Sequence, residues 1–117
     1  YNLLALNRQS CAEDLFEVIV INNGSTDATK EMLSYMNTNY ALKTVCLDEN
    51  KGRAYARNCG INEAEGEIII FHDSDMIAEK EYVAKHIQAH HKYNVAVCGQ
   101  NWSRIYSYYY EGYNQYQ

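Results

Sequence analysis

Residues 67–75 read E-I-I-I-F-H-D-S-D and end in two aspartates, Asp73 and Asp75. The apolar run before them predicts a strand that is buried on both faces. Side chains two positions apart in an extended segment point the same way, so we expect the two carboxylates to converge. Converging carboxylates repel unless a cation lies between them, and hard divalent cations prefer oxygen ligands. Because ligands of open α/β sheets bind beyond the carboxyl ends of the strands, the pair indicates a metal-assisted site for a phosphorylated ligand.

A second group of candidates is basic and lies in the segment N-K-G-R-A-Y-A-R-N. Arg53 and Arg57 are four residues apart and therefore share one face of the helix predicted there. Arginine is unfavourable near a helix N-terminus unless an anion compensates its charge. With Lys51, the two arginines indicate a bound phosphate or diphosphate. The alternatives are a solvated basic face, or ion pairs to Glu63 or Glu65.

A third motif, N-N-G-S-T-D, follows the first predicted strand and begins at Asn22. Gly24 permits a positive φ, and the amides after it open the N-terminus of a helix. The cap of that helix is expected from Ser25, Thr26 or Asp27. Taken alone, this motif is typical of an ordinary strand–turn–helix junction.

These candidates need a scaffold, and the chain predicts strands that alternate with helices. The apolar runs predict strands at 16–21, 42–47, 68–71 and 95–98. The helical patterns lie at 3–11, 28–36, 53–64 and 79–93. Such alternation is typical of βαβ units, so we expect an α/β fold with a mostly parallel sheet and flanking helices.

Composition narrows the class of protein. A chain of 117 residues is one domain at most. Its net charge of −5, without a stripe of lysine or arginine, excludes a general nucleic-acid binder. No apolar run is long enough to span a membrane, and no secretory signal is present, so we expect a cytoplasmic location, with any attachment to the inner membrane face made by other parts of the protein. A start at Tyr1 rather than methionine indicates a fragment or a processed piece.

The four cysteines form no C-x-x-C pair, so neither a zinc site nor a redox pair is indicated. Three of them lie in apolar contexts and are expected to be buried free thiols: Cys46, Cys59 and Cys98. His86 and His90 share a helix face, a spacing that suits either a metal pair or a plain exposed helix.

Four motifs stand in a fixed order: Y-N, then F-E-V-I-V-I-N-N-G-S-T-D, then E-N-K-G-R-A-Y-A-R-N-C-G-I, then A-E-G-E-I-I-I-F-H-D-S-D. In this order and at these intervals they resemble the donor half of the family 2 glycosyltransferases, over residues 16–99. The resemblance implies a Rossmann-like GT-A fold, incomplete here. Residues 1–105 would form the nucleotide-sugar-binding half-domain, and residues 106–117 a tyrosine-rich tail.

The resemblance also implies roles for the acidic pair and for the first residue. Asp75 would be the more direct ligand of Mn²⁺ or Mg²⁺, and Asp73 would lie nearer the ribose or sugar while completing the metal site. The metal would hold the diphosphate of a nucleotide sugar. Tyr1 would stack on the base, which in this family is usually uracil.

Three further residues match nucleotide-binding positions of the family. Asn50 and Arg57 match the loop asparagine and the helix arginine. Asn22 stands where the family has an acidic residue that contacts the base. A neutral amide still hydrogen-bonds a base edge but lacks the charge of a carboxylate, so the preference for a UDP-sugar is weakened.

The function implied is that of an inverting hexosyl or hexosaminyl transferase, which moves the donor sugar to the hydroxyl of a saccharide or another acceptor. The acidic general base of the family has no match here; His72 and Glu111 are within reach, but no context marks either, and a histidine beside a metal pair is typically structural. One alternative is a non-catalytic remnant that binds nucleotide sugars. Another is a phosphatase that forms an aspartyl-phosphate, although that class expects Gly-Thr where Met76 and Ile77 stand.

Overall fold

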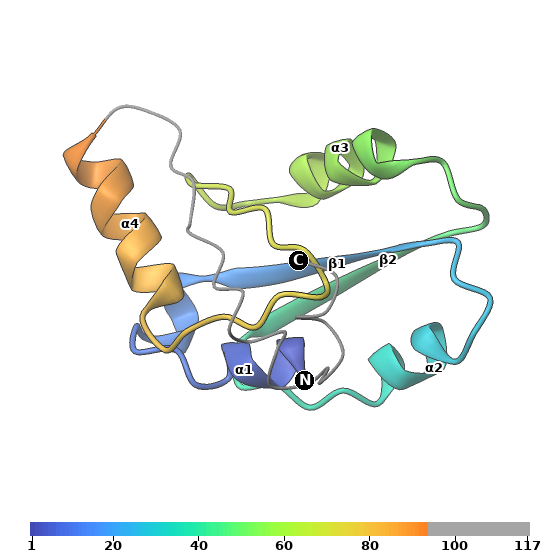
Figure 1. The fold of residues 1–117 in the computed structure, drawn as a ribbon, viewed down its shortest axis with the longest axis horizontal. Coiled ribbons are helices and arrows are strands. Elements are labelled where there is room, and N and C mark those ends of the chain that lie inside the picture. The colour runs from blue at the N-terminus through green and yellow to red at the C-terminus, as the bar shows by residue number, and fades with distance from the viewer. Residues whose placement is uncertain (94–117) are drawn as a thin grey trace, which may run out of the picture.

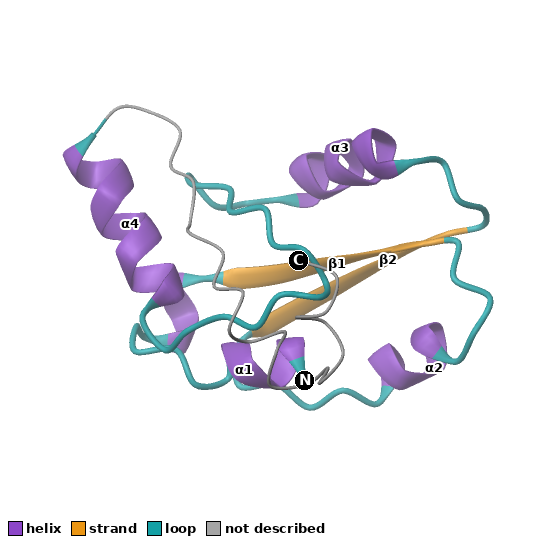
Figure 2. Cartoon of the chain, viewed as in Figure 1, coloured by secondary structure: helices purple, strands orange, loops and turns teal. Residues whose placement is uncertain are grey.

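The computed structural model describes residues 1–93 (Figures 1 and 2). Its elements, in chain order, are α1 (Asn2–Leu6), the 3-10 helix η1 (Glu13–Leu15), β1 (Glu17–Asn23), α2 (Thr29–Ser34), β2 (Ala41–Leu47), α3 (Arg53–Glu63) and α4 (Tyr82–Lys92). The α/β class is confirmed. The strand predicted at 95–98 and the tail at 106–117 lie outside the described residues.

The sheet in this part of the chain consists of β1 and β2, which run parallel and pair from Glu17 with Ala41 to Asn23 with Leu47. Figure 1 shows α3 on one side of the strands, and α1 and α2 on the other. Parallel strands need a crossover connection, and α2 lies within it. The predicted parallel sheet with flanking helices is therefore confirmed as a partial GT-A-like arrangement.

β1 separates a packed side from an open side. Val18 packs against a small core that contains Leu6 and Tyr40. Ile19 and Ile21 alternate with it and line a cavity under α3. One face of β1 therefore packs against the core, and the opposite face lines the candidate site.

The strand predicted at residues 68–71 is not formed, and the prediction of burial on both faces is wrong. Ile69 is 41% exposed and Phe71 is 54% exposed. A strand requires a hydrogen-bonded neighbour, and here the cavity lies between this segment and β1 in place of a backbone ladder. The segment therefore runs as a loop along the open side of β1.

The first helix is shorter than predicted because the chain turns toward a distant loop. α1 ends at Leu6 instead of residue 11. The next residue, Asn7, accepts a hydrogen bond from the Asn39 backbone at 3.0 Å, and Asn39 Nδ2 donates to the Asn7 carbonyl at 3.1 Å. The predicted cap of the second helix is wrong: Ala28 is the N-cap residue of α2 and no side chain caps it, although Asp27 accepts from Thr29 N at 3.0 Å. Cys46 is exposed, not buried as predicted.

The described residues include no helix that is both long and apolar enough to cross a lipid bilayer.

His86 makes folding stability depend on pH. It is 9% exposed, and its ring lies 4.9 Å from that of Tyr82 and 6.5 Å from that of His90. Burial lowers the pKa of His86 below its ordinary value of 6.5, and the charges of His90 and His72 lower it further. Because the folded state then binds this proton less readily than the unfolded state, stability is present above the unfolded pKa and lost as the pH falls below it.

We therefore expect the melting temperature to drop between about pH 7.5 and pH 5.5, and His86→Phe to remove part of that drop. The rest persists because burial also lowers the pKa of His72. Thermal unfolding measured across this range checks the expectation. An identical pH slope in His86→Phe would contradict it.

Candidate active site

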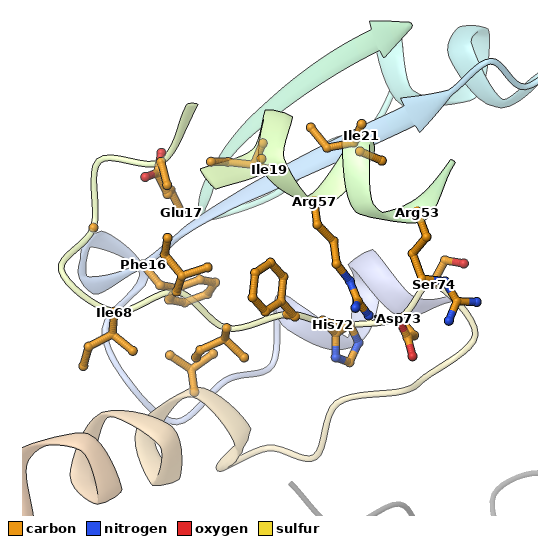
Figure 3. Close-up of a pocket in the computed structure, with 18 of the residues that line it drawn as sticks. Phe16, Glu17, Ile19, Ile21, Arg53, Arg57, Ile68, His72, Asp73 and Ser74 are labelled. Atoms are coloured by element: carbon orange, nitrogen blue, oxygen red, sulfur yellow. Dashed lines mark ion pairs between the residues drawn. The ribbon is translucent and has the colours of Figure 1, made fainter. Parts of the chain in front are cut away.

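A cavity of about 1160 Å³ lies between β1, α3 and the loop that carries the two aspartates. Figure 3 shows Arg53 and Arg57 extending from α3 toward residues 72–74. The cavity is lined by three of the residues that the sequence predicts at the nucleotide: Asn50, Arg57 and Asp73. Segments far apart in the chain thus bring basic, amide and acidic groups to one concave surface.

Arg57 lies against the acidic segment. Its Nη2 is 3.6 Å from Asp73 Oδ1, and its guanidinium lies 5.4 Å from the ring centroid of Phe71. The arginine and aspartate side chains are 46% and 63% exposed, so this ion pair contributes little to stability. Sequence analysis also offered ion pairs of the arginines with Glu63 or Glu65. In the structure Lys43 Nζ pairs with these glutamates, at 3.7 Å from Glu63 and 3.8 Å from Glu65. Arg57 thus lines the cavity beside Asp73, and its contact with a phosphate stays a prediction.

The loop after β2 is tied to the end of β1 by an asparagine pair. Asn23 Nδ2 donates to Asn50 Oδ1 at 3.0 Å, and Lys51 N donates to Asn23 Oδ1 at 3.0 Å. Asn50 Oδ1 also accepts from Gly52 N at 2.9 Å. Asn23 was not singled out from the sequence, although the doubled asparagine at the end of an apolar strand is a signal that could have identified it.

Gly24 lies close against the backbone of the loop after β2. Its φ is +73°, and a Cβ built there would lie 2.4 Å from Asn50 N. A side chain at this position would be strained and would also collide with the loop. The positive φ predicted for this glycine is confirmed.

Asn22 and Tyr1 are not among the residues that line the cavity. The Asn22 side chain is buried; its Oδ1 accepts from Ser25 N at 3.0 Å, and its Nδ2 lies 3.9 Å from Cys46 Sγ. In this arrangement Asn22 closes the turn that follows β1. Tyr1 is 95% exposed at the start of α1. Contact of either residue with a base stays a prediction.

The two aspartates lie on a turn. Met76 N donates to the Asp73 carbonyl at 3.0 Å, so the extended geometry expected between Asp73 and Asp75 is wrong. Both carboxylates still influence His72. Burial lowers the pKa of His72, while the hydrogen bond to the Met76 carbonyl and the negative charges of Asp73 and Asp75 oppose that shift.

The donor set suits a cation that is shared with a ligand. No group of three histidine, cysteine or acidic side chains that could hold a metal occurs within residues 1–93. Mg²⁺ is commonly bound through one or two carboxylates together with substrate phosphates and water. Both carboxylates are exposed and so open to a cation, as that arrangement requires. Asp75 is not among the residues that line the cavity, and metal binding by the pair stays a prediction.

Comparison with known proteins indicates the family of the chain. The family model described as "Glycosyl transferase family 2" matches residues 2–116. The chain is 51% identical to "Uncharacterized glycosyltransferase YfnE" of Bacillus subtilis (strain 168), over 98% of this chain and 30% of that protein. It is 34% identical to "Glycosyltransferase AglE" of Haloferax volcanii, over 71% of this chain and 28% of that protein.

A third relative is "Poly-beta-1,6-N-acetyl-D-glucosamine synthase" of Staphylococcus epidermidis, which is 37% identical over 56% of this chain and 16% of its own length. The chain thus spans less than a third of the length of these relatives. No solved structure matches significantly. The family match covers nearly every residue of the chain, and the chain belongs to glycosyl transferase family 2.

Proposed function

We propose that this chain is the nucleotide-sugar-binding half of a metal-dependent inverting glycosyltransferase, which moves a sugar from a nucleotide diphosphate to an acceptor hydroxyl. The observation that carries the proposal is the convergence of Asn50, Arg57 and Asp73 on one cavity of a family 2 chain. The family and its named glycosyltransferases support transfer over both alternatives, the binding-only remnant and the phosphatase.

In this proposal the protein neutralises the departing diphosphate. Negative charge grows on that group as the bond to the sugar breaks, and positioned cations lower the energy of the charged transition state. Arg57 supplies one such charge from α3, and Asn50 orients the nucleotide from the loop after β2. Asp73 and Asp75 would hold Mn²⁺ or Mg²⁺, which when bound supplies Lewis-acid stabilisation of the leaving group. The general base that deprotonates the acceptor is not assigned to any residue of this chain.

For the donor we favour a UDP-sugar. Tyr1 would stack on the base, and Asn22 would offer an amide where the family has an acid. A relative named as a poly-N-acetylglucosamine synthase supports the inclusion of hexosaminyl donors in any screen. A saccharide hydroxyl is the favoured acceptor, and the cytoplasm the favoured location.

The proposed function is tested by incubating the protein with a panel of nucleotide sugars and Mn²⁺ and following release of the nucleotide diphosphate. Metal-dependent release with sugar transferred to an added acceptor is the expected result. Binding without any turnover at every metal concentration would favour the remnant. Release of inorganic phosphate from simple phosphate esters would favour the phosphatase.

Replacement of Arg57 tests the diphosphate contact. We expect Arg57→Gln to weaken binding of UDP in Mn²⁺ by about tenfold or more, because a charge-assisted hydrogen bond is lost. The melting temperature should change little, since the Asp73 pair is exposed. Lys43→Gln is the matched control, because it removes the same charge from a residue that does not line the cavity. Equal affinities for UDP in the two variants would contradict the assignment.

A further inference from the structure

We infer that Asn2 is a positioning residue that fixes the turn of Asp73 and Asp75 through hydrogen bonds shared with His72 and Tyr82. We call these hydrogen bonds the clamp. Whether the clamp exists does not depend on the proposed function, but its consequence for metal binding rests on that function.

Asn2 holds the turn from the first helix of the chain. Its Nδ2 donates to the carbonyl of Asp73 and to that of Ser74, each at 3.2 Å. Its Oδ1 lies 2.8 Å from His72 Nε2. The Asn2 side chain therefore donates to two consecutive carbonyls of the D-S-D segment. It also hydrogen-bonds His72, the residue that precedes this segment.

His72 completes the clamp from inside. Its Nε2 faces two acceptors, Asn2 Oδ1 and the Met76 carbonyl at 3.1 Å, so this nitrogen carries a proton. Its Nδ1 lies 3.2 Å from the Tyr82 hydroxyl, which donates to it in the neutral imidazole. The rings of His72 and Tyr82 also meet edge to face, with centroids 5.1 Å apart. Every polar atom of the Asn2 and His72 side chains has a partner of the matching type.

The turn needs such external support. Its internal backbone bond joins Met76 N to the Asp73 carbonyl, and its aspartates are exposed. An exposed loop with few internal bonds opens at low free-energy cost. Three of its four carbonyls, those of Asp73, Ser74 and Met76, accept from the clamp. A turn held in this way presents its carboxylates without first having to be ordered, which favours binding of a cation.

The chain offers a matched control for Asn2. Gln9 also joins the N-terminal segment to the chain around the start of α4: its Nε2 donates to the Glu79 carbonyl at 2.8 Å, and its Oε1 accepts from Val83 N at 2.9 Å. These bonds do not touch the turn of Asp73 and Asp75. Asn2→Ala and Gln9→Ala therefore remove comparable ties between the same two regions, but only the first frees the turn.

The test measures hydrogen exchange at the Met76 amide and Mn²⁺ binding in the presence of UDP by electron paramagnetic resonance. We expect Asn2→Ala to speed exchange at Met76 by about tenfold and to weaken Mn²⁺ affinity by about 10- to 100-fold, with neither effect in Gln9→Ala. Tyr82→Phe, which keeps the ring and removes only the hydroxyl, should give the same two effects at a smaller size.

The outcomes separate this inference from the proposed function. Equal exchange at Met76 in the Asn2 and Gln9 variants, or in wild type and Tyr82→Phe, would overturn the clamp. Faster exchange with unchanged Mn²⁺ affinity would overturn its role in positioning the metal ligands. If wild-type protein bound no Mn²⁺ with UDP, the proposed function would fail, and the exchange data alone would still decide whether the clamp exists.

Discussion

Asp75→Asn is expected to lower the rate of glycosyl transfer by about 10²-fold or more and to abolish the effect of Mn²⁺ on nucleotide binding. The substitution keeps the size of the side chain and removes the negative charge on which a divalent cation depends. Without the cation, the growing charge of the departing diphosphate would be met only by basic side chains such as Arg57. Steady-state kinetics and UDP titrations, each with and without Mn²⁺, measure the two effects.

Asp14→Asn serves as the control for this substitution. Asp14 is an equally exposed aspartate in η1, outside the turn that carries Asp73 and Asp75, so its loss should alter neither transfer nor the Mn²⁺ effect. An Asp75→Asn enzyme that transfers sugar at the wild-type rate, with the usual response to Mn²⁺, would show that the metal ligand has been misassigned.

Gly24→Ala is expected to have the largest effect on stability. A φ of +73° costs a residue with a Cβ about 1–2 kcal/mol. The new Cβ would also lie 2.4 Å from both Asn50 N and the Glu49 carbonyl carbon, and such overpacking adds about 1–3 kcal/mol. Because the displaced loop carries Asn50, nucleotide binding should weaken together with stability.

Gly52→Ala separates the two costs. The φ of Gly52 is +87°, yet nothing lies within 4 Å of a Cβ built there. We therefore expect only the conformational cost, about 1–2 kcal/mol. Chemical denaturation of the two variants gives the comparison. Equal losses of unfolding free energy would mean that the loop after β2 does not press on Gly24, and the described packing of the site would be wrong.

The elements that could be predicted from the sequence are those with local causes. β1, β2 and α3 follow from apolar runs and periodicity, and each was predicted to within two residues at either end. The segment at 68–71 has an equally apolar pattern but is a loop, because a strand also depends on a bonded partner distant in the chain. The end of α1 is likewise decided by Asn39, which lies 32 residues away from Asn7.

The residues of the candidate site likewise include some that the sequence predicts and some that it does not. Asn50, Arg57 and Asp73 were predicted to act together, and the structure places all three on one cavity, which is lined by the loop after β2, by α3 and by the loop that carries Asp73. The contacts of Asn2 were not foreseen, since they join residues 70 or more positions apart. The Y-N pair at the start of the chain was the available signal, but spacing alone does not indicate which carbonyls an asparagine will bind.

The metal bridge is tested most directly by a calorimetric titration of the wild-type protein with UDP, once in Mn²⁺ and once in a chelator. We predict saturable binding in Mn²⁺ that is weaker by about tenfold or more in the chelator. Binding of equal strength under both conditions would contradict a metal bridge between the acidic turn and the diphosphate. Absence of binding to UDP and to every other nucleoside diphosphate would contradict the site itself.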